Sequence, residues 1–292
     1  MRKRKRILFV INPISGGKKK TAFNKQVLEV LDLEKFDPTF KITDHPNHAY
    51  ELGKSAILEG YDAVVAVGGD GTINELGSAI LGTDMPLGIV PEGSGNGLAL
   101  YLGIPLNESA AIRRINRFDT VEVDTGEING RNFFNIAGLG FDASVSDHFA
   151  TETIRGPIGY LRSAINVLSN FKPSIYRLVI DGKEYRKEAF MISVANSPQY
   201  GNNAYIAPQA SINDGILDVC IVKRFPLYLL PKMVFHLFNK SADQSEYVEI
   251  IPGKKIEIVR DGKGPVHVDG EPVEMGEKLE IAIRHKSLKI IC

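Results

Sequence analysis

Three short runs of apolar residues, each followed by a glycine-rich loop and a helix-like pattern, constrain the fold of this chain more than any other feature. The runs are Ile7–Ile11, Ala63–Val67 and Leu87–Val90. Strands that are apolar throughout, and do not alternate with polar residues, are typical of a parallel sheet that is covered on both faces. We therefore predict that the first part of the chain is an α/β domain built on a parallel sheet.

From about Val121 the pattern changes to short strands joined by tight turns. The dipeptides Asn129-Gly130 and Asp181-Gly182 favour two-residue hairpin turns, and each lies between alternating segments. The second part is therefore predicted to be a mostly antiparallel β domain, and we expect the two domains to cover residues 1–122 and 123–276. Further strands are predicted at Ile216–Val222, Lys255–Val259, Lys278–Ile283 and Leu288–Ile291, and helices at Pro157–Ser169 and Pro231–Asn239.

The charge balance and the cysteine count exclude several classes of protein. Lysine plus arginine equals aspartate plus glutamate at 35 each. No overall basic field therefore exists to attract nucleic acid, and we expect no nucleic-acid partner. The two cysteines, Cys220 and Cys292, are too few for a disulfide framework, which favours a reducing cytoplasm.

The most apolar segment of the chain, FPLYLLPKMVFHLF, is broken by Pro226 and Pro231. It is too interrupted to span a membrane, so we expect only peripheral contact with one. Helical spacing places five of its apolar residues on one face, which we predict to face the core. Phe235, Tyr228 and Leu227 remain as candidates for membrane contact, with Lys18–Lys20 and Arg155 as basic neighbours. The five residues are Leu230, Met233, Val234, Leu237 and Phe238.

The glycine-rich loops carry the strongest chemical signal. They read NPISGG after the first run, GGDGT after the second and PEGSGNG after the third. Because the carboxyl ends of parallel strands meet at one edge of a sheet, we expect the loops to lie together there. Glycines let amide groups approach a phosphate, and a helix N-terminus adds partial positive charge. Asp70 would repel that phosphate without an intervening cation, so the loops predict a nucleotide with Mg²⁺.

These motifs also have other interpretations. A single loop of this kind can simply close a strand-to-helix turn, and Asp70 could cap a helix. The spacing of a P-loop is absent. The stretch GLGFDA, from Gly138 to Ala143, fits a dinucleotide-binding pattern, but it follows a predicted hairpin strand and is not interpreted as an NAD site.

Near the C-terminus, the stretch HVDGEP offers two acids on either side of Gly270. Phosphoryl transfer to an alcohol needs an acceptor for the alcohol proton, and a carboxylate in a partly desolvated cleft can supply it. The alternative is a solvated hairpin turn at Asp269-Gly270. His267 is predicted to be structural.

Taken together, these blocks resemble the catalytic-domain family of diacylglycerol kinases, whose relatives include sphingosine and ceramide kinases and bacterial lipid kinases. GGDGT extended through Asn74-Glu75 matches the family, as does NPISG. The stretches VDTGEINGRNFFNIAGLGFDA, APQASINDGILDV and HVDGEP follow in the family's order. NAD kinases share GGDGT, but they would not explain the later blocks.

The resemblance implies ATP-dependent phosphorylation of a lipid hydroxyl with Mg²⁺, at a membrane surface that the protein contacts peripherally. It also implies that residues 277–292 complete the first domain, and it leaves a homodimer possible. The catalytic residues that it implies are Asp70, Asp269 and Glu271. The implied nucleotide contacts are Asn12, Pro13, Ser15, Gly16, Thr43, Gly68, Gly69, Asp70, Gly71, Thr72, Asn74, Gly93 and Ser94. The implied metal ligands are Asp70, Asp124 and Asp214 with the backbone oxygens of Ser211 and Ile216, and the implied lipid contacts are Lys18 and Asp142.

Several alternatives stay open at this point. The third loop, residues 93–97, is closer to the sphingosine and ceramide kinase version than to that of diacylglycerol kinases, so the acceptor is either a diacylglycerol-like lipid or a long-chain base. The spacing does not decide whether Asp269 or Glu271 takes the proton. An NAD kinase and a non-catalytic module that binds nucleotide or lipid remain the alternative functions.

Overall fold

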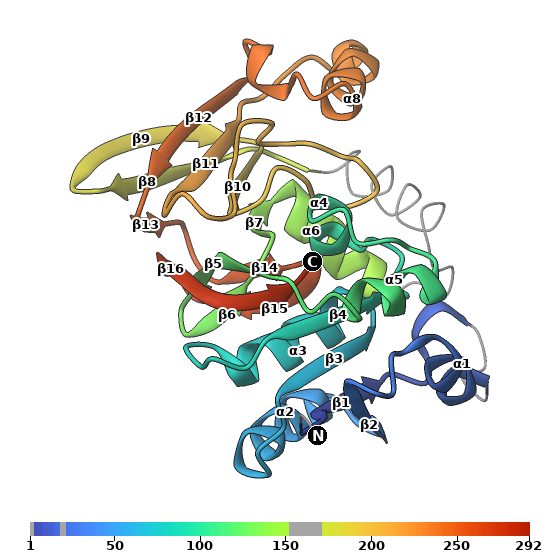
Figure 1. Cartoon of the computed structure of the whole chain (residues 1–292). Coiled ribbons are helices and arrows are strands. Elements are labelled where there is room, and N and C mark those ends of the chain that lie inside the picture. The colour runs from blue at the N-terminus through green and yellow to red at the C-terminus, as the bar shows by residue number, and fades with distance from the viewer. Residues whose placement is uncertain (1–2, 18–21, 152–170) are drawn as a thin grey trace. The chain divides into compact units, whose positions relative to one another are not determined.

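The computed structural model describes residues 3–17, 22–151 and 171–292, and it divides into two compact units (Figure 1). The first unit contains Met1–Val123 and Lys286–Cys292, and the second contains Asp124–His285. The chain has the mixed architecture that the sequence predicted, with a parallel sheet first and antiparallel sheets after it. Lys18 and the helix predicted at Pro157–Ser169 lie outside the described residues.

The first unit is built on a parallel sheet in the order β2-β1-β3-β4, followed by the C-terminal end of β16. Its strands are β1 (Lys5–Ile11), β2 (Phe36–Ile42), β3 (Ala63–Gly68) and β4 (Leu87–Pro91), with β5 (Thr120–Ile128) at the end of the unit and β16 (Lys278–Ile291) returning to it. Its helices are the short η1 (Ser15–Gly17), α1 (Phe23–Val30), α2 (His48–Leu58), α3 (Asp70–Ile80), α4 (Gly97–Tyr101) and α5 (Glu108–Ile115). Helix α2 packs against α3, and α1 packs against α5.

The apolar runs explain why these strands lie in the middle of the sheet. Every residue of β3 and β4 is buried, and so are Ile7–Ile11 of β1. Strand β2 was not predicted, because it contains Pro38 and polar residues. It forms the edge of the sheet, where a missing amide hydrogen is tolerated.

The second unit contains two antiparallel sheets whose facing residues share one core. One sheet has the order β12-β11-β10-β7-β14-β15, and the other contains β16-β13-β8-β9, with β5 and β6 forming a hairpin. Leu178 and Ile258 of the second sheet share a core with Ile192 and Val219 of the first. The strands are β6 (Arg131–Phe133), β7 (Ile136–Gly140), β8 (Ser174–Ile180), β9 (Lys183–Ala189), β10 (Met191–Ala195), β11 (Leu217–Val222), β12 (Val248–Gly253), β13 (Lys255–Val259), β14 (Gly264–Val268) and β15 (Glu271–Met275). The helices are α6 (Phe141–Thr151), α8 (Leu230–Phe238) and the short η3 (Leu227–Leu229) and η4 (Ala242–Gln244).

The hairpin turns predicted at Asn129-Gly130 and Asp181-Gly182 are confirmed by their backbone angles, and Asp269-Gly270, where a hairpin turn was the alternative interpretation, forms one as well. Asn129-Gly130, Asp181-Gly182 and Asp269-Gly270 all have positive φ at both residues, which is the geometry of a type I′ turn. The prediction of two separate strands over 278–283 and 288–291 was wrong, because one strand of 14 residues, β16, covers both. Lys286, with φ 47°, lies where this strand passes from the second unit into the first.

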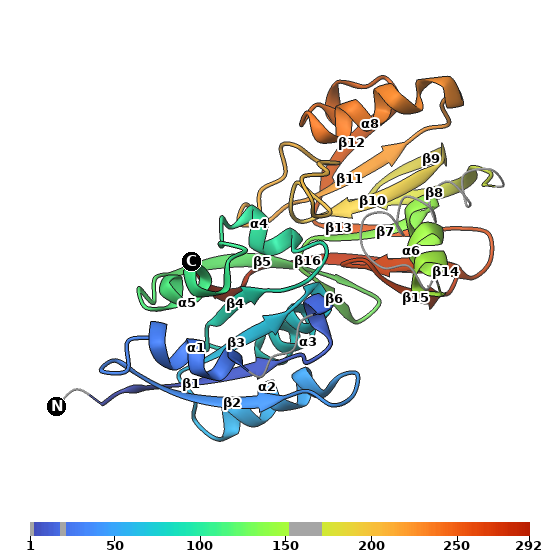
Figure 2. The same ribbon diagram turned by 90° about the vertical axis from the view of Figure 1, so that its right-hand side faces the viewer.

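Helix α8 differs from the prediction that its apolar stripe faces the core. None of its residues, all within the described part of the chain, is buried. Met233 and Leu237 pack against the core, but Val234 is 45% exposed and Phe238 is 55% exposed. Within the second unit, Figure 2 shows α8 beside β12, at the opposite end of the sheet from β14 and β15. No helix in the described ranges is long and apolar enough to cross a membrane.

Candidate active site

The loops that follow β1, β3 and β4 leave the sheet at one edge, as the parallel order requires. The amide of Asn12 donates to the carbonyl of Val67 at 2.9 Å, which joins the first loop to the end of β3. The amide of Glu92 donates to the carbonyl of Gly68 at 2.8 Å, which joins the third loop to the second. The structure therefore brings together the glycine-rich segments that the sequence assigned to phosphate binding.

Asp70 begins α3 and holds the third loop against the second. Its carboxylate accepts hydrogen bonds from the amides of Asn96 (2.9 Å) and Gly97 (3.0 Å), so it caps the neighbouring helix α4. The two loops approach so closely that a Cβ atom on Gly93 would lie 2.6 Å from the Cα of Gly69. Glycine is therefore required here by a close backbone approach. Asp70 has a structural role in addition to any role at a phosphate.

The first loop is tied to the second by side chains that the sequence singled out. The Asn12 amide group donates to the Thr72 hydroxyl at 3.1 Å, and the Ser15 hydroxyl donates to the Asn12 carbonyl at 2.9 Å. Thr43 follows β2, and its amide donates to the carbonyl of Ile11 at 2.9 Å. The other predicted nucleotide contacts lie in these loops or in α3: Pro13, Gly16, Gly68, Gly71, Asn74 and Ser94.

In the second unit, Asp269 lies in the turn between β14 and β15, and its carboxylate is engaged by backbone amides. One oxygen accepts from Phe134 at 2.9 Å, and the other accepts from Asn135 at 2.8 Å and Ile136 at 3.2 Å. The amide of Asp269 in turn donates to the carbonyl of Ile136. Asp269 therefore fixes the turn onto the segment that leads into β7.

Glu271 has a different environment, although it is only two residues away. It is the first residue of β15, and its side chain is exposed. The two acids of HVDGEP are thus not equivalent: the Asp269 carboxylate shapes the turn, and the Glu271 carboxylate is accessible from solvent.

Asp142, predicted to contact lipid, is 6% exposed and lies at the centre of a buried polar cluster. Its carboxylate accepts hydrogen bonds from the hydroxyls of Ser193 (3.0 Å) and Tyr200 (3.1 Å). The Nε2 atom of His267 lies 3.1 Å from the same oxygen, and the amide of Ala143 donates to the other at 2.8 Å. Asp142 therefore joins α6 to the strands of the sheet below it.

The Asp142–His267 contact also reaches the turn that carries the two acids. The amide of Gly270 donates to His267 Nδ1 at 3.4 Å, so that ring nitrogen is an acceptor and Nε2 is the donor to Asp142. A Cβ atom on Gly138 would lie 2.3 Å from both Asp142 Oδ2 and His267 Nε2. A glycine at that position is what gives the pair its space.

Asp124 joins the middle of β5 to the turn that contains Ser211, Asp214 and Ile216. It is fully buried, and its carboxylate accepts from the Gly215 amide at 2.6 Å and lies 2.8 Å from His285 Nδ1. Its own amide donates to the Ile212 carbonyl. Asp124, Ser211, Asp214 and Ile216 are therefore in the second unit and close together, whereas Asp70 belongs to the first.

The donors of this turn fit a hard divalent cation. Asp214 is exposed and accepts from the Ile216 amide at 3.0 Å, and the backbone oxygens of Ser211 and Ile216 complete an oxygen-only set of the kind that Mg²⁺ prefers. Asp218 was missed by the sequence reasoning. Burial, and then the negative charge of Asp214, raises the pKa of the Asp218 carboxyl, so the two carboxylates repel each other.

Comparison with known proteins assigns both halves of the chain. Residues 6–128 match the profile of the diacylglycerol kinase catalytic domain, and residues 135–292 match that of the YegS C-terminal NAD kinase beta sandwich-like domain. The chain belongs to the diacylglycerol kinase family of lipid kinases.

Individual relatives cover nearly the whole chain. A diacylglycerol kinase of Bacillus subtilis is 28% identical over 91% of this chain and 90% of its own length. A Pseudomonas aeruginosa protein named "Probable lipid kinase YegS-like" is 28% identical over 86% of this chain and 83% of its own. A crystal structure of a diacylglycerol kinase from Bacillus anthracis has a TM-score of 0.75 at 19% identity and covers 100% of this chain and 98% of its own, which supports the fold.

Sequence reasoning missed several residues that shape the candidate site. Asn96 closes the third loop, because its side chain accepts from the Gly93 amide at 2.8 Å and donates to the Gly93 carbonyl at 2.7 Å. Its φ of 51° is an angle that asparagine tolerates, so an asparagine among glycines was an available signal. Ser193 and Tyr200 gave no local signal, since their partner Asp142 is more than 50 residues away.

Proposed function

We propose that this chain is an ATP-dependent kinase that uses Mg²⁺ and phosphorylates a hydroxyl group of a diacylglycerol-like or long-chain-base lipid. The observation that carries the proposal is the meeting of the glycine-rich loops at one sheet edge, tied together by Asn12, Thr72 and Asp70. Membership of the lipid kinase family supports a lipid as the acceptor.

The reaction divides the work between the two groups of residues. The loop amides and the N-terminus of α3 bind and orient the phosphates, because both present N–H groups to an anion. The lipid oxygen then bonds to the γ-phosphorus, the bond from that phosphorus to the bridging oxygen breaks, and ADP leaves. Bound Mg²⁺ would neutralise phosphate charge beside Asp70. The alcohol proton passes to a carboxylate.

We assign that carboxylate to Glu271 and give Asp269 a positioning role. The support is geometric: the oxygens of Asp269 accept from the amides of residues 134–136 and so hold the turn, and Glu271 begins β15 directly after that turn. Asp269 holds the turn from which Glu271 projects, and the His267–Gly270 contact holds the same turn from its other side.

A water-insoluble acceptor must be collected from a membrane, and α8 is the surface that we propose meets it. Tyr228 is 79% exposed and Phe235 is 61% exposed, and Val234 and Phe238 are exposed beside them. Aromatic side chains of this kind favour the headgroup region of a bilayer. Lys232, exposed on the same helix, would add attraction to anionic lipid.

The direct test is phosphate transfer from labelled ATP in MgCl₂ to diacylglycerol, sphingosine, ceramide and, as a soluble control, NAD. Label in a lipid product is the expected result. Label in NAD alone, or in no acceptor, would overturn the proposal in favour of an NAD kinase or a non-catalytic binding module.

The assignment of the base is tested by single variants in the same assay. Glu271→Gln should lower kcat about 10²–10⁴-fold and leave nucleotide affinity unchanged. The matched control is Glu274→Gln, an exposed acid on the same strand. Asp70→Asn should weaken nucleotide binding, and it should therefore lower turnover with every acceptor. Near-normal turnover in Glu271→Gln would transfer the role to Asp269.

A further inference from the structure

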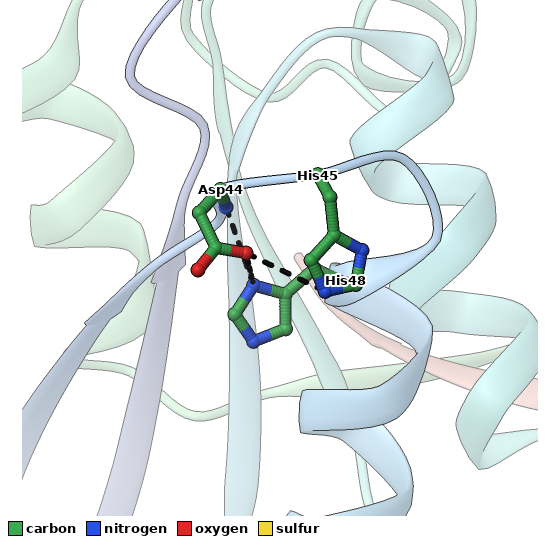
Figure 3. Close-up of side chains that lie close together, drawn as sticks. All are labelled: Asp44, His45 and His48. Atoms are coloured by element: carbon green, nitrogen blue, oxygen red, sulfur yellow. Dashed lines mark hydrogen bonds and ion pairs between the residues drawn. The ribbon is translucent and has the colours of Figure 1, made fainter.

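The loop between β2 and α2, together with the first turns of α2, carries histidine and acidic side chains whose donor atoms face one another (Figure 3). Asp44 Oδ1 lies 2.6 Å from His48 Nδ1 and 3.4 Å from His45 Nε2. Glu51 adds a second carboxylate, with Oε2 3.8 Å from His45 Nε2. None of these side chains takes part in the reaction proposed above. Asp44, His45 and His48 form one group of potential metal donors, and Glu51 lies beside that group.

The chemistry of the donors selects a particular class of cation. Imidazole nitrogens combined with carboxylate oxygens suit Zn²⁺ and neighbouring transition metals, whereas Mg²⁺ prefers oxygen donors alone. Two donors on a tetrahedral zinc are about 3.3 Å apart, because each bond is about 2.0–2.1 Å long. The Asp44–His45 separation of 3.4 Å already meets this requirement. The Asp44–His48 separation of 2.6 Å would have to open by about 0.7 Å, and the hydrogen bond that the Asp44 amide donates to His48 Nδ1 would have to break.

The side chains have the freedom to make that adjustment. Those of Asp44 and His45 are 73% and 49% exposed, and that of His48 is 20% exposed. The two imidazole rings stack with centroids 4.5 Å apart and planes 4° from parallel, so their lone pairs must turn to converge. Rotation about the second side-chain torsion of histidine is soft, and it moves no backbone.

The backbone beneath these side chains is held in place by α3. The carboxylate of Glu75 accepts from the amides of Asn47 (2.9 Å) and Ala49 (3.1 Å), and Asn47 has a φ of 69°. A loop that is fixed in this way presents its donors with little loss of entropy on binding.

The charges around the histidines favour a cation. The carboxylates of Asp44 and Glu51 lie 3.4 Å and 3.8 Å from His45 Nε2. The same carboxylates would attract a metal ion, and they offset the positive N-terminus of α2. Protons and metal compete for the imidazoles, because only neutral imidazole coordinates.

We propose that Asp44, His45 and His48 form a binding site for a divalent transition-metal ion of the zinc class, with the Glu51 carboxylate beside it. The site is separate from the oxygen donors assigned to Mg²⁺. Thr43 directly precedes it and is bonded to Ile11 at the end of β1, so the ion would lie on the edge of the sheet from which the glycine-rich loops leave.

The test is a calorimetric titration of the full chain with ZnCl₂ at pH 7.5, in millimolar MgCl₂ to occupy oxygen-only sites. The unmodified chain should bind Zn²⁺, and His45→Gln, His48→Asn and Asp44→Asn should each weaken that binding about 10- to 100-fold. The matched control is His236→Gln, which removes a histidine of α8 and should bind as the unmodified chain does.

A second readout shows the ligands directly. Co²⁺ bound by imidazole and carboxylate absorbs visible light, so the unmodified chain should develop that spectrum and the His45→Gln/His48→Asn double variant should not. Both measurements use folded protein, which circular dichroism verifies. Equal zinc affinity in the unmodified chain and the double variant, or no binding by either, would overturn the proposal.

Discussion

The buried cluster around Asp142 offers the sharpest test of how the second unit is held together. In Asp142→Ala, the hydroxyls of Ser193 and Tyr200 and the Nε2–H group of His267 all lose their shared acceptor. Asp142 and His267 are 6% and 2% exposed, so water does not readily replace the lost carboxylate. Each buried donor that is left without its acceptor costs about 1–3 kcal/mol, so the loss of three should cost at least about 3–5 kcal/mol, a large share of the roughly 5–15 kcal/mol that stabilises a typical protein.

This cost should be visible in scanning calorimetry, which resolves the melting transitions of the chain. About 2–4 °C of Tm is lost per kcal/mol in a domain of 150–250 residues, so Asp142→Ala should lower the Tm of the second unit by about 6–20 °C. The control is Asp147→Ala, an exposed acid on the same helix, for which a change within about 0.5 kcal/mol is expected. If the two variants melt together, the cluster does not stabilise the unit and the reasoning is refuted.

Three further predictions concern other parts of the molecule. Asp214→Ala should abolish the rise in Tm that MgCl₂ produces in the unmodified chain, because it removes the side-chain oxygen donor of the turn; a rise of equal size in the variant would contradict the assignment. Phe235→Asp should reduce sedimentation with anionic vesicles, whereas Leu58→Asp, at an equally apolar site on α2 that is 88% exposed, should not. The pKa of Glu249 is lowered, chiefly by its hydrogen bond with Lys187. The stability that this carboxylate contributes is therefore present above its unfolded pKa near 4.5, and it is lost as pH falls through the folded value. Glu249→Gln should therefore lower stability by about 1 kcal/mol at pH 7, and denaturant titrations at pH 3 should show a smaller difference.

Local sequence patterns predicted the parts of the fold that depend on local causes. The apolar runs of β1, β3 and β4 and the type I′ turns were visible because burial and backbone angle act on adjacent residues. Strand β2 and the continuous strand β16 could not be predicted in this way. The edge position of β2 and the passage of β16 from one unit to the other both depend on partners that are distant in the sequence. Helix α8 misled for a related reason, since an apolar stripe does not say whether anything covers it.

The candidate site shows the same limit. The glycine-rich loops were found from the apolar runs that precede them, and the individual nucleotide contacts were implied by the family resemblance. The hydrogen bonds from the amides of residues 134–136 to Asp269 could not be predicted, since more than 130 positions separate the partners. The pairing of Asp142 with His267 could not be predicted either. The choice between Asp269 and Glu271 depended on the hydrogen bonds to Asp269, so it could be argued only once the structure was known.

The course of β16 also affects how the chain matures during synthesis. Its N-terminal half pairs with β13, but residues 286–292 belong to the first unit, where Ile290 pairs with Leu87, Gly82 donates to Ser287 and Cys292 donates to Asp119. A ribosome must therefore translate the whole second unit before the first can close the open edge of β4. Until then the nascent first unit exposes a strand edge that can pair with other chains, so its folding depends on chaperones or on rapid completion of the second unit.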